Sequence, residues 1–489
     1  MKRISLQKKQ PMRKQIFYVI LLFVLQISAS FAQNKPKYIF YMIGDGMGLN
    51  QVHIAESYQA ALENRNTVFP LTFTKFPFST FATSFSLSHG VTDSAAAGTA
   101  LAVGHKTKNG VIGMDSSRTE TYKSIAYFAK EQGMKVGITT SVSIDHATPA
   151  SFYANQADRN MYYEIGQDLI KSGFHFFGGA GFLSPEKTYK KEAAPSLFPQ
   201  FEKAGYTLAY GLKEYKKIAN TADKVILMAD KGTPAEALTY AIDRKPEELT
   251  LQQITASAIQ TLQKDNDKGF FLMVEGGKID WACHSNDGAT AIQETKDFDA
   301  AVAEAFRFYA QHPEETLILV TADHETGGMV LGNGSSTLQL SRIQHQKVSQ
   351  GVLSNKISDL RKATPNASWD VVKQLLEENT GLWKSVKISE TEEKEIKEAY
   401  NRSFVQHQNE TEKSLYAIDD RIAALAVKAL NRAASISWAS GNHSAAYIPI
   451  YAIGQGADLF HQKMDNIDIP HKIAEAAGLP MVSQAAATR

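Results

Sequence analysis

Pairs of Asp and His residues with the spacing of metal ligands occur in the second half of the chain. Asp280 and His284, separated by three residues, can bind one divalent cation, because zinc and similar ions choose carboxylate and imidazole ligands. Asp323 and His324 are adjacent. On an irregular loop both could bind a second ion, whereas a strand would direct them to opposite faces. Two ions about 4 Å apart would hold the attacking and leaving oxygens of a phosphoryl displacement.

Ser94 could supply the nucleophile for such a reaction. Turn-forming residues up to Asp93 give way at Ser94 to a run of helix-forming residues, which predicts a helix that begins there. The unpaired N–H groups at a helix N-terminus favour an alkoxide and bind phosphate. Thr92 or Asp93 followed by alanines is also the pattern of an ordinary N-cap, so this stretch alone leaves both interpretations open. No general base stands beside Ser94 in the sequence, and a metal is therefore the natural means of deprotonating it.

The elements that would position these residues are apolar segments with the length of buried strands. Between them lie helical patterns, the clearest of which follows Ala291, with Phe298, Val302 and Ala305 at helical spacing. Strands that alternate with helices predict an α/β fold, a three-layer α/β/α sandwich around a large, mostly parallel central sheet. The predicted strands are residues 37–43, 136–140, 225–228, 269–274, 316–320 and 448–453.

Polar residues follow four of these strands, at the points where the strands end. For any one of them, a loop-capping Asp or a hydrogen-bonded core histidine is the simpler interpretation. In a parallel sheet, however, residues beyond the carboxyl ends of the strands gather at one rim, where such folds bind ligands. Four strand ends of this kind therefore predict one site. The residues, in chain order, are Asp45, His146, Thr148, Glu275, Asp280, His284, Asp323 and His324.

The segment 331–435 differs in composition and in residue pattern from the rest of the chain. It is polar and mostly helical in pattern, with a capping box formed by Ser389 and Glu392 and a further helix predicted after Ser414. We interpret it as a helical insertion. Two roles are open for it: simple surface bulk, or a cover over the site or a subunit contact. The predicted core then consists of residues 33–330 and 436–489.

Residues 1–32 have the pattern of a secretory signal peptide: six basic and no acidic residues, an apolar run and small residues ending at Ala32. The apolar run, 16–25, is too short for a transmembrane helix. We therefore expect export to the periplasm or the medium, with no membrane anchor after cleavage. The remaining chain has 46 basic and 51 acidic residues, which provides no basic surface for nucleic acid. Cys283 is the single cysteine, so no disulfide can form within the chain.

Five motifs, together with His443 in a Gly/Ser-rich loop, resemble those of alkaline phosphatases. Their order along the chain is that of the family, and the resemblance spans residues 37–457. A lone D-G-M-G would be a weak signal, whereas the joint match is very specific. The motifs are IGDGMG at 43–48, VTDSAA at 91–96, HATPA at 146–150, VEG at 274–276 followed by Asp280 and His284, and TADH at 321–324.

The resemblance implies a role for each matching position. Ser94 would be the nucleophile that forms a phosphoseryl intermediate. Arg159, thirteen residues after His146, would bind phosphate oxygens in a fork, and Asp93 would orient it. The family holds two Zn²⁺ and, usually, one Mg²⁺. The first zinc would be bound by Asp280, His284 and His443, the second by Asp45, Asp323 and His324, and the magnesium by Asp45, Thr148 and Glu275.

Three positions depart from the family's pattern or invite a second interpretation. His146 stands where some bacterial members have a magnesium-supporting aspartate, so the third ion would be bound through water and less tightly. Trp281 stands where other members have a lysine or histidine that reaches toward phosphate. A second positively charged contact to the substrate, besides Arg159, is therefore in doubt. Trp281 could instead form a wall at the leaving group or simply pack. Cys283 lies between two expected ligands, but a small buried thiol is the simpler interpretation.

We predict a phosphomonoesterase that hydrolyses phosphate monoesters to an alcohol and phosphate. Sulfatases share the metal-binding core, but Ser94 is not followed by the x-Pro-x-Arg that they need. A phosphodiesterase is an alternative, which Arg159 disfavours because it suits a terminal phosphate with free oxygens. A non-catalytic metal- or phosphate-binding protein is a second alternative, and it predicts binding without turnover. Members of the family are often dimers, so a homodimer is a further expectation, although the segment 331–435 could create or block that contact.

Overall fold

A computed structural model describes residues 35–481 of the chain. The predicted signal peptide, 1–32, lies outside the described residues. Within them, ten strands form one large sheet. These strands are β1 (Tyr38–Gly44), β2 (Phe78–Thr83), β3 (Lys135–Thr140), β4 (Phe176–Gly179), β5 (Thr207–Tyr210), β6 (Val225–Met228), β7 (Phe270–Gly276), β8 (Thr316–Ala322), β15 (Ile448–Gly454) and β16 (Met464–Asp465).

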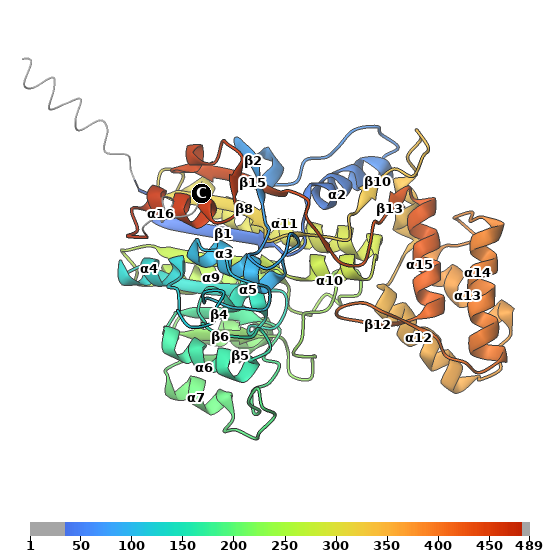
Figure 1. Cartoon of the computed structure of the whole chain (residues 1–489), viewed down its shortest axis with the longest axis horizontal. Coiled ribbons are helices and arrows are strands. Elements are labelled where there is room, and N and C mark those ends of the chain that lie inside the picture. The colour runs from blue at the N-terminus through green and yellow to red at the C-terminus, as the bar shows by residue number, and fades with distance from the viewer. Residues whose placement is uncertain (1–34, 482–489) are drawn as a thin grey trace, which may run out of the picture. The chain divides into compact units, whose positions relative to one another are not determined.

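The sheet is mostly parallel, and its strand order is β16-β2-β15-β8-β1-β7-β3-β4-β6-β5 (Figure 1). Only β15 runs against its neighbours, β8 and β2. The six predicted strands correspond to β1, β3, β6, β7, β8 and β15. Strand β7 extends to Gly276, so that Glu275 lies inside the strand's end rather than after it. The sheet also contains β2, β4, β5 and β16, which are short or carry few large apolar residues and therefore lie outside the predicted segments.

Four neighbouring strands, β8-β1-β7-β3, end at one rim of the sheet. In the register of β1, Gly44 pairs with Gly276 of β7 and with Ala322 of β8, and Thr140 of β3 pairs with Glu275. Because these parallel strands end level with one another, the residues that follow them emerge side by side. The predicted polar residues are therefore delivered to the same rim.

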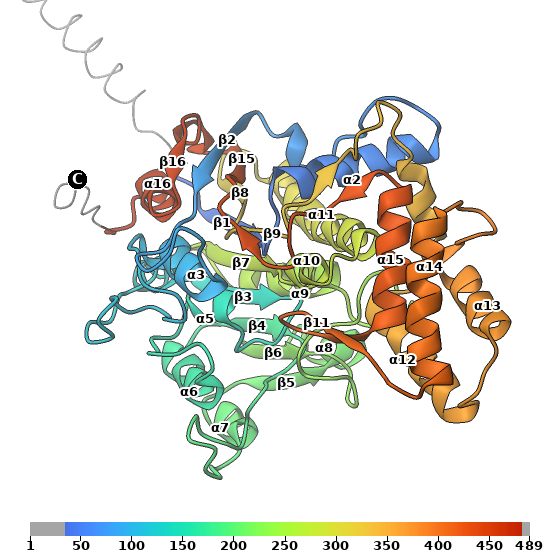
Figure 2. The ribbon, with the colours of Figure 1, turned by 45° about the vertical axis from the view of Figure 1, so that its right-hand side comes forward.

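Helices cover both faces of this sheet. They are α2 (Leu49–Leu62), α3 (Ser94–Val103), α4 (Ile125–Glu131), α5 (Ala147–Ala150), α6 (Tyr162–Ser172), α7 (Leu197–Lys203), α8 (Gly211–Ile218), α9 (Leu251–Gln263), α10 (Lys278–His284), α11 (Gly288–Gln311) and α16 (Asp468–Ala477). Helices α9 and α11 pack together on one face, and α3, α4 and α5 lie over the other (Figure 2). Strands β1, β7 and β8 are buried along their whole length. The predicted three-layer α/β/α fold is confirmed.

Most of the segment 331–435 is helical. Its buried apolar side chains, among them Leu353, Val372 and Leu430, form a second hydrophobic cluster, which also includes Ile54 of α2 and Ile292 of α11. The helices of the segment stand beside the sheet (Figure 2). The predicted capping box of Ser389 is present at the start of α14. The elements are α12 (Gln350–Ala363), α13 (Trp369–Thr380), α14 (Glu390–Tyr400), β11 (Thr411–Lys413), β12 (Ile418–Asp420) and α15 (Arg421–Ala433), with a 3₁₀ turn at Leu340–His345 and a π turn at Asn401–Val405.

The helix predicted after Ser414 begins only at Arg421, so the predicted start is wrong. Strands β11 and β12 form a hairpin in its place. Ser414 does not cap a helix but closes the hairpin turn, where its Oγ accepts a hydrogen bond from the N–H of Ala417 at 3.1 Å. Asp420 is the actual cap, because its carboxylate accepts from the N–H of Ile422 at 2.9 Å.

Two short strand pairs connect the helical segment and the rim to the rest of the chain. Strand β10 (Val330–Leu331) pairs with β13 (Ile436–Ser437), so the helical segment leaves and re-enters the core at one place. A segment that leaves and re-enters a core at one place has the geometry of an insertion. We therefore propose that residues 331–435 are an insertion in the core. Strand β9 (Glu325–Thr326) pairs with β14 (His443–Ser444) and carries His443 toward the rim.

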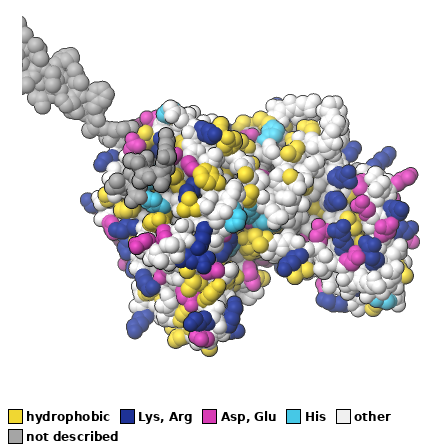
Figure 3. Space-filling model, in the orientation of Figure 1, with side chains coloured by type: hydrophobic (Ala, Val, Ile, Leu, Met, Phe, Trp, Pro, Cys, Tyr) yellow, Lys and Arg dark blue, Asp and Glu magenta, His cyan; other side chains and the backbone are white. Residues whose placement is uncertain are grey.

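Basic and acidic side chains are mixed on the face of the molecule shown in Figure 3, most densely over the helices α12 to α15. Among the helices of residues 35–481, none combines the length and the apolar character needed to cross a membrane.

Candidate active site

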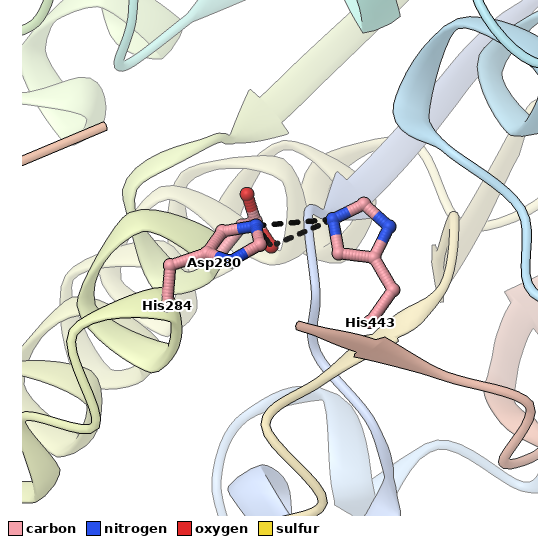
Figure 4. A group of neighbouring side chains, drawn as sticks. All are labelled: Asp280, His284 and His443. Atoms are coloured by element: carbon pink, nitrogen blue, oxygen red, sulfur yellow. Dashed lines mark hydrogen bonds and ion pairs between the residues drawn. The ribbon is translucent and has the colours of Figure 1, made fainter. Parts of the chain in front are cut away.

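Asp280, His284 and His443 form the first group of candidate metal ligands (Figure 4). Asp280 and His284 lie one turn apart on α10, and His443 comes from β14. The Nε2 atoms of the two histidines are 3.1 Å apart, and they lie 3.4 Å and 3.6 Å from Oδ1 of Asp280. Each histidine's Nδ1 faces a backbone carbonyl, of Gly441 at 2.7 Å and of Thr92 at 2.8 Å. These carbonyls accept the Nδ1 protons, so both Nε2 lone pairs point into the group, as in metal-binding histidines.

Asp45, Asp323 and His324 form a second group, which is completely buried. Nε2 of His324 lies 3.3 Å from Oδ1 of Asp45 and 3.3 Å from Oδ2 of Asp323. Asp323 and His324 follow β8 on irregular chain, which allows adjacent side chains to face the same point. The N–H of Gly46 donates to Oδ1 of Asp323 at 3.1 Å and holds this carboxylate. The rings of His324 and His443 stack with centroids 3.6 Å apart, so the first and second groups are adjacent.

Asp45 also belongs to a third group, with His146 and Glu275. The family resemblance implies that His146 acts through water. In the structure, a ring nitrogen of His146 lies within 4.8 Å of carboxylate oxygens of both acids. Thr148, on the short helix α5, is close by and its hydroxyl donates to Oδ2 of Asp323 at 3.4 Å. His146 and Thr148 therefore both lie beside the two carboxylates of the third group.

The electrostatics of these groups fit divalent cations. Burial raises the pKa of Asp45 and of Asp323 well above the usual value, and neighbouring carboxylates raise it further. Burial also raises the pKa of Glu275 to about 7. Both oxygens of Asp45, Oε1 of Glu275 and Oδ2 of Asp280 are buried without a hydrogen-bond partner among the described residues. Unpartnered buried polar atoms are rare in native proteins, and these donor types are the ones that zinc and magnesium bind.

Ser94 is the first residue of α3 and faces the second group. Its side chain is fully buried, and its Oγ lies 3.2 Å from Nε2 of His324. The N-cap of α3 is Asp93, whose Oδ1 accepts a hydrogen bond from the N–H of Ala96 at 3.0 Å. Capping therefore accounts for Asp93. It leaves the Ser94 hydroxyl at the N-terminus of the helix and directed at the candidate metal ligands.

Arg159 lies beside the start of α3. Its Nη1 donates to Oδ2 of Asp93 at 3.2 Å, and its Nη2 lies 3.3 Å from Nε2 of His146. Its backbone N–H donates to the carbonyl of Gly110 at 2.8 Å, which fixes the chain at this point. The side chain is 17% exposed. The guanidinium is thus held from two sides and is still accessible, which suits a group that binds an anion.

Tyr416 is a residue of the site that the sequence analysis did not identify. Its ring stacks on Trp281 with centroids 4.4 Å apart and an interplanar angle of 11°. Its hydroxyl lies 3.4 Å from Nη2 of Arg159 and 3.4 Å from Nε2 of His146. Tyr416 lies in the stretch with the misleading helical pattern, so no local signal could have found it. Cys283 is buried and belongs to none of the three groups found within residues 35–481.

Comparison with known families identifies this arrangement. One family model, described as alkaline phosphatase, matches residues 36–175 and 187–479. The chain belongs to the alkaline phosphatase family. The matched ranges include all the motifs on which the resemblance rests, and the resemblance is confirmed. The protein is therefore an enzyme of the alkaline phosphatase family, with groups of buried side chains that can bind metal.

Several alkaline phosphatases are similar to this chain over most of their length. Alkaline phosphatase 4 of Bacillus subtilis is 33% identical, and the match covers 88% of this chain and 86% of that protein. Alkaline phosphatase 3 of the same organism is 32% identical, with 91% and 89% covered. The structure of the cold-active alkaline phosphatase of Shewanella sp. is 26% identical in sequence. The match covers 90% of this chain and 99% of that chain, and the TM-score is 0.74. A TAB5 alkaline phosphatase variant has magnesium bound in its M3 site. It is 25% identical to this chain, the match covers 91% of this chain and 99% of that one, and the TM-score is 0.63.

Proposed function

We propose that this member of the alkaline phosphatase family is an exported phosphomonoesterase in which Ser94 is the nucleophile. The observation that carries the proposal is the position of Ser94 Oγ, at the N-terminus of α3 and 3.2 Å from His324. The helix N-terminus stabilises negative charge on this oxygen. Attack by Oγ on a phosphate monoester would form a Ser94–phosphate ester and release the alcohol. Water would then cleave that ester, releasing phosphate and restoring the hydroxyl.

The ions proposed are two Zn²⁺ and one Mg²⁺. When bound, such ions offset the charge of phosphoryl oxygens as Lewis acids and lower the pKa of the oxygen groups they coordinate. The choice of magnesium for the third group draws on the TAB5 variant, in which a histidine is replaced by glutamate and magnesium is bound in the M3 site. The proposed ligands are Asp280, His284 and His443 for one zinc, Asp45, Asp323 and His324 for the other, and Asp45, Thr148 and Glu275 for magnesium, with His146 beside them acting through water.

Arg159 is the proposed phosphate-binding residue, and Asp93 holds it in place. A planar guanidinium can donate two parallel hydrogen bonds to the oxygens of a terminal phosphate. A phosphodiester has fewer free oxygens for this contact, which is why we favour monoesters over diesters. A diester-to-monoester rate ratio above one would reverse this choice and establish the phosphodiesterase alternative.

Export and assembly are part of the same proposal. Cleavage near Ala32 would release the mature chain into the periplasm or the medium, and mass determination of the exported protein would test the cleavage point. A homodimer is proposed from the family, and light scattering of the purified protein would test it.

The deciding experiment measures hydrolysis of a chromogenic phosphate monoester by the purified protein, before and after chelation and after zinc and magnesium are returned. We expect activity to be lost with the chelator and restored by both metals. In Ser94→Ala, turnover should fall by at least about a thousandfold while orthophosphate still binds, because only the covalent step is removed. Wild-type turnover in Ser94→Ala would refute the nucleophile. Phosphate binding without any turnover by the metal-loaded wild type would establish the non-catalytic alternative.

A further inference from the structure

The hairpin β11–β12 of the helical segment places Tyr416 against the rim of the core, and Ser414 of the same hairpin contacts Ser285, with their Oγ atoms 3.3 Å apart. Figure 2 shows this hairpin extending from the helices toward the sheet. The hydroxyl of Tyr416 contacts Arg159 and His146, and its ring contacts Trp281 face to face and His284 edge to face, with centroids 5.5 Å apart. The helical segment therefore touches the candidate phosphate-binding residue through one tyrosine.

The hairpin is firmly anchored at its base. Asp419 is buried, and its carboxylate accepts hydrogen bonds from Gln350 at 2.7 Å and from Ser354 at 3.2 Å, both on α12. The carboxylate of Asp420 accepts from Arg361. These bonds fix β12 against α12. The turn between the two strands is short, and the anchoring of β12 therefore also fixes the position of Tyr416 at the rim.

The hydrogen bonds around Arg159 have defined directions. A guanidinium can only donate, so Nη2 donates to the Tyr416 hydroxyl, and the Nε2 of His146 that faces Nη2 at 3.3 Å is an acceptor. The tyrosine hydroxyl also faces that Nε2, at 3.4 Å, and would share the nitrogen's single lone pair with Nη2. On the other side, Nη1 is held by Asp93. Asp93 and Tyr416 therefore hold the two amino groups of Arg159 from the core and from the helical segment respectively.

We propose that Tyr416 is a positioning residue that holds Arg159 in its phosphate-binding orientation, so that the helical segment completes the phosphate site. This inference rests on the proposed function, because it takes Arg159 as the phosphate-binding residue. The competing interpretation is that Tyr416 merely packs on Trp281. The two differ in what the hydroxyl does: positioning requires it, whereas packing does not.

Tyr416→Phe tests the hydroxyl alone, since the ring that stacks on Trp281 is kept. We expect the dissociation constant of orthophosphate, measured by calorimetry on the metal-loaded protein, to rise about three- to tenfold, which is the net contribution of one ordinary hydrogen bond. The KM for a phosphate monoester should rise in parallel, with a smaller change in kcat. Ile418→Ala is the matched control: Ile418 lies on the same hairpin and its side chain is exposed, so phosphate affinity should not change.

A double-mutant cycle with Arg159→Ala shows whether the tyrosine acts through the arginine. If it does, Tyr416→Phe should have no further effect on phosphate affinity once Arg159 is gone. The inference is overturned by wild-type phosphate affinity in Tyr416→Phe, by an equal effect of Tyr416→Phe with and without Arg159, or by an equal effect of Ile418→Ala. Failure to bind orthophosphate in the metal-loaded wild type would also overturn it. Binding without turnover would refute only the proposed function, because the affinity comparison needs no catalysis.

Discussion

Replacing Gly46 by alanine is expected to damage the metal site more than the fold. Gly46 has φ +70°, and a Cβ built there would lie 2.8 Å from Oγ1 of Thr326, 2.9 Å from the backbone Cα of Asp280 and 3.0 Å from its Cβ. The left-handed backbone costs an alanine about 1–2 kcal/mol of stability. The steric overlap adds a displacement, because one of the contacted atoms belongs to the backbone of α10 and cannot rotate away.

The displaced residues are those that arrange the first group. Thr326 donates a hydrogen bond to Oδ1 of Asp280, the oxygen that faces His284 and His443. Metal–ligand distances tolerate only about 0.2 Å of change, and disturbed supporting contacts typically weaken metal binding about ten- to a hundredfold. We therefore expect zinc affinity in Gly46→Ala to fall by that factor and phosphatase activity at limiting zinc to fall with it.

Gly205→Ala separates the two effects. Gly205 has φ +90°, and a Cβ there meets no described atom within 4 Å, so this variant bears the backbone cost alone. Zinc affinity is measured by competition with a chromophoric chelator, and stability by denaturant unfolding of the metal-free proteins. Equal stability losses in the two variants, together with wild-type zinc affinity in Gly46→Ala, would refute the steric argument.

Two further predictions concern Asp93 and Glu275. Asp93→Asn keeps the oxygen that caps α3 but replaces Oδ2, which faces Arg159 and accepts from the N–H of Gly110 at 3.0 Å, so orthophosphate affinity by calorimetry should fall about three- to tenfold. Asp93→Ala should in addition lose about 1 kcal/mol in denaturant unfolding, and equal losses in both variants would contradict the capping role. Burial raises the pKa of Glu275 to about 7, so the folded metal-free protein binds the carboxyl proton of Glu275 more tightly than the unfolded chain does. The stability of the folded metal-free protein therefore falls as the pH rises from about 4.5 to 7. Glu275→Gln should flatten that fall and melt at a higher temperature than wild type in chelator at pH 8; a lower melting temperature there would contradict it.

Local patterns were sufficient for most of the core. The six predicted strands are present because each contains a short, mostly apolar run with the length of a buried strand. The start of α3 at Ser94 follows from turn residues meeting helix formers. The same reasoning failed after Ser414, where the residues before Arg421 form a hairpin and not the first turns of the helix. There the buried carboxylates of Asp419 and Asp420, bound to α12 and α15, outweigh local helix propensity.

The third group of candidate ligands was only partly predictable. The family resemblance named Asp45, Thr148 and Glu275 as ligands and His146 as a neighbour, with the third ion bound through water. The approach of a His146 nitrogen to Asp45 and Glu275 depends on how the loop between β3 and α5 packs over β7. Packing of this kind leaves no trace in the spacing of residues along the chain.

The sequence by itself determined the residue types at the ends of the strands and the alternation of strands and helices, because periodicity and capping are local properties. Its motifs also determined the family. Only the tertiary structure decided which side chains meet. Ser94 and His324 are 230 positions apart, and Arg159 and Tyr416 are 257 apart, yet each pair is in contact. Such contacts depend on strand order, on register and on the anchoring of a hairpin from the helical segment. These arise from the packing of the whole chain and not from any stretch of it.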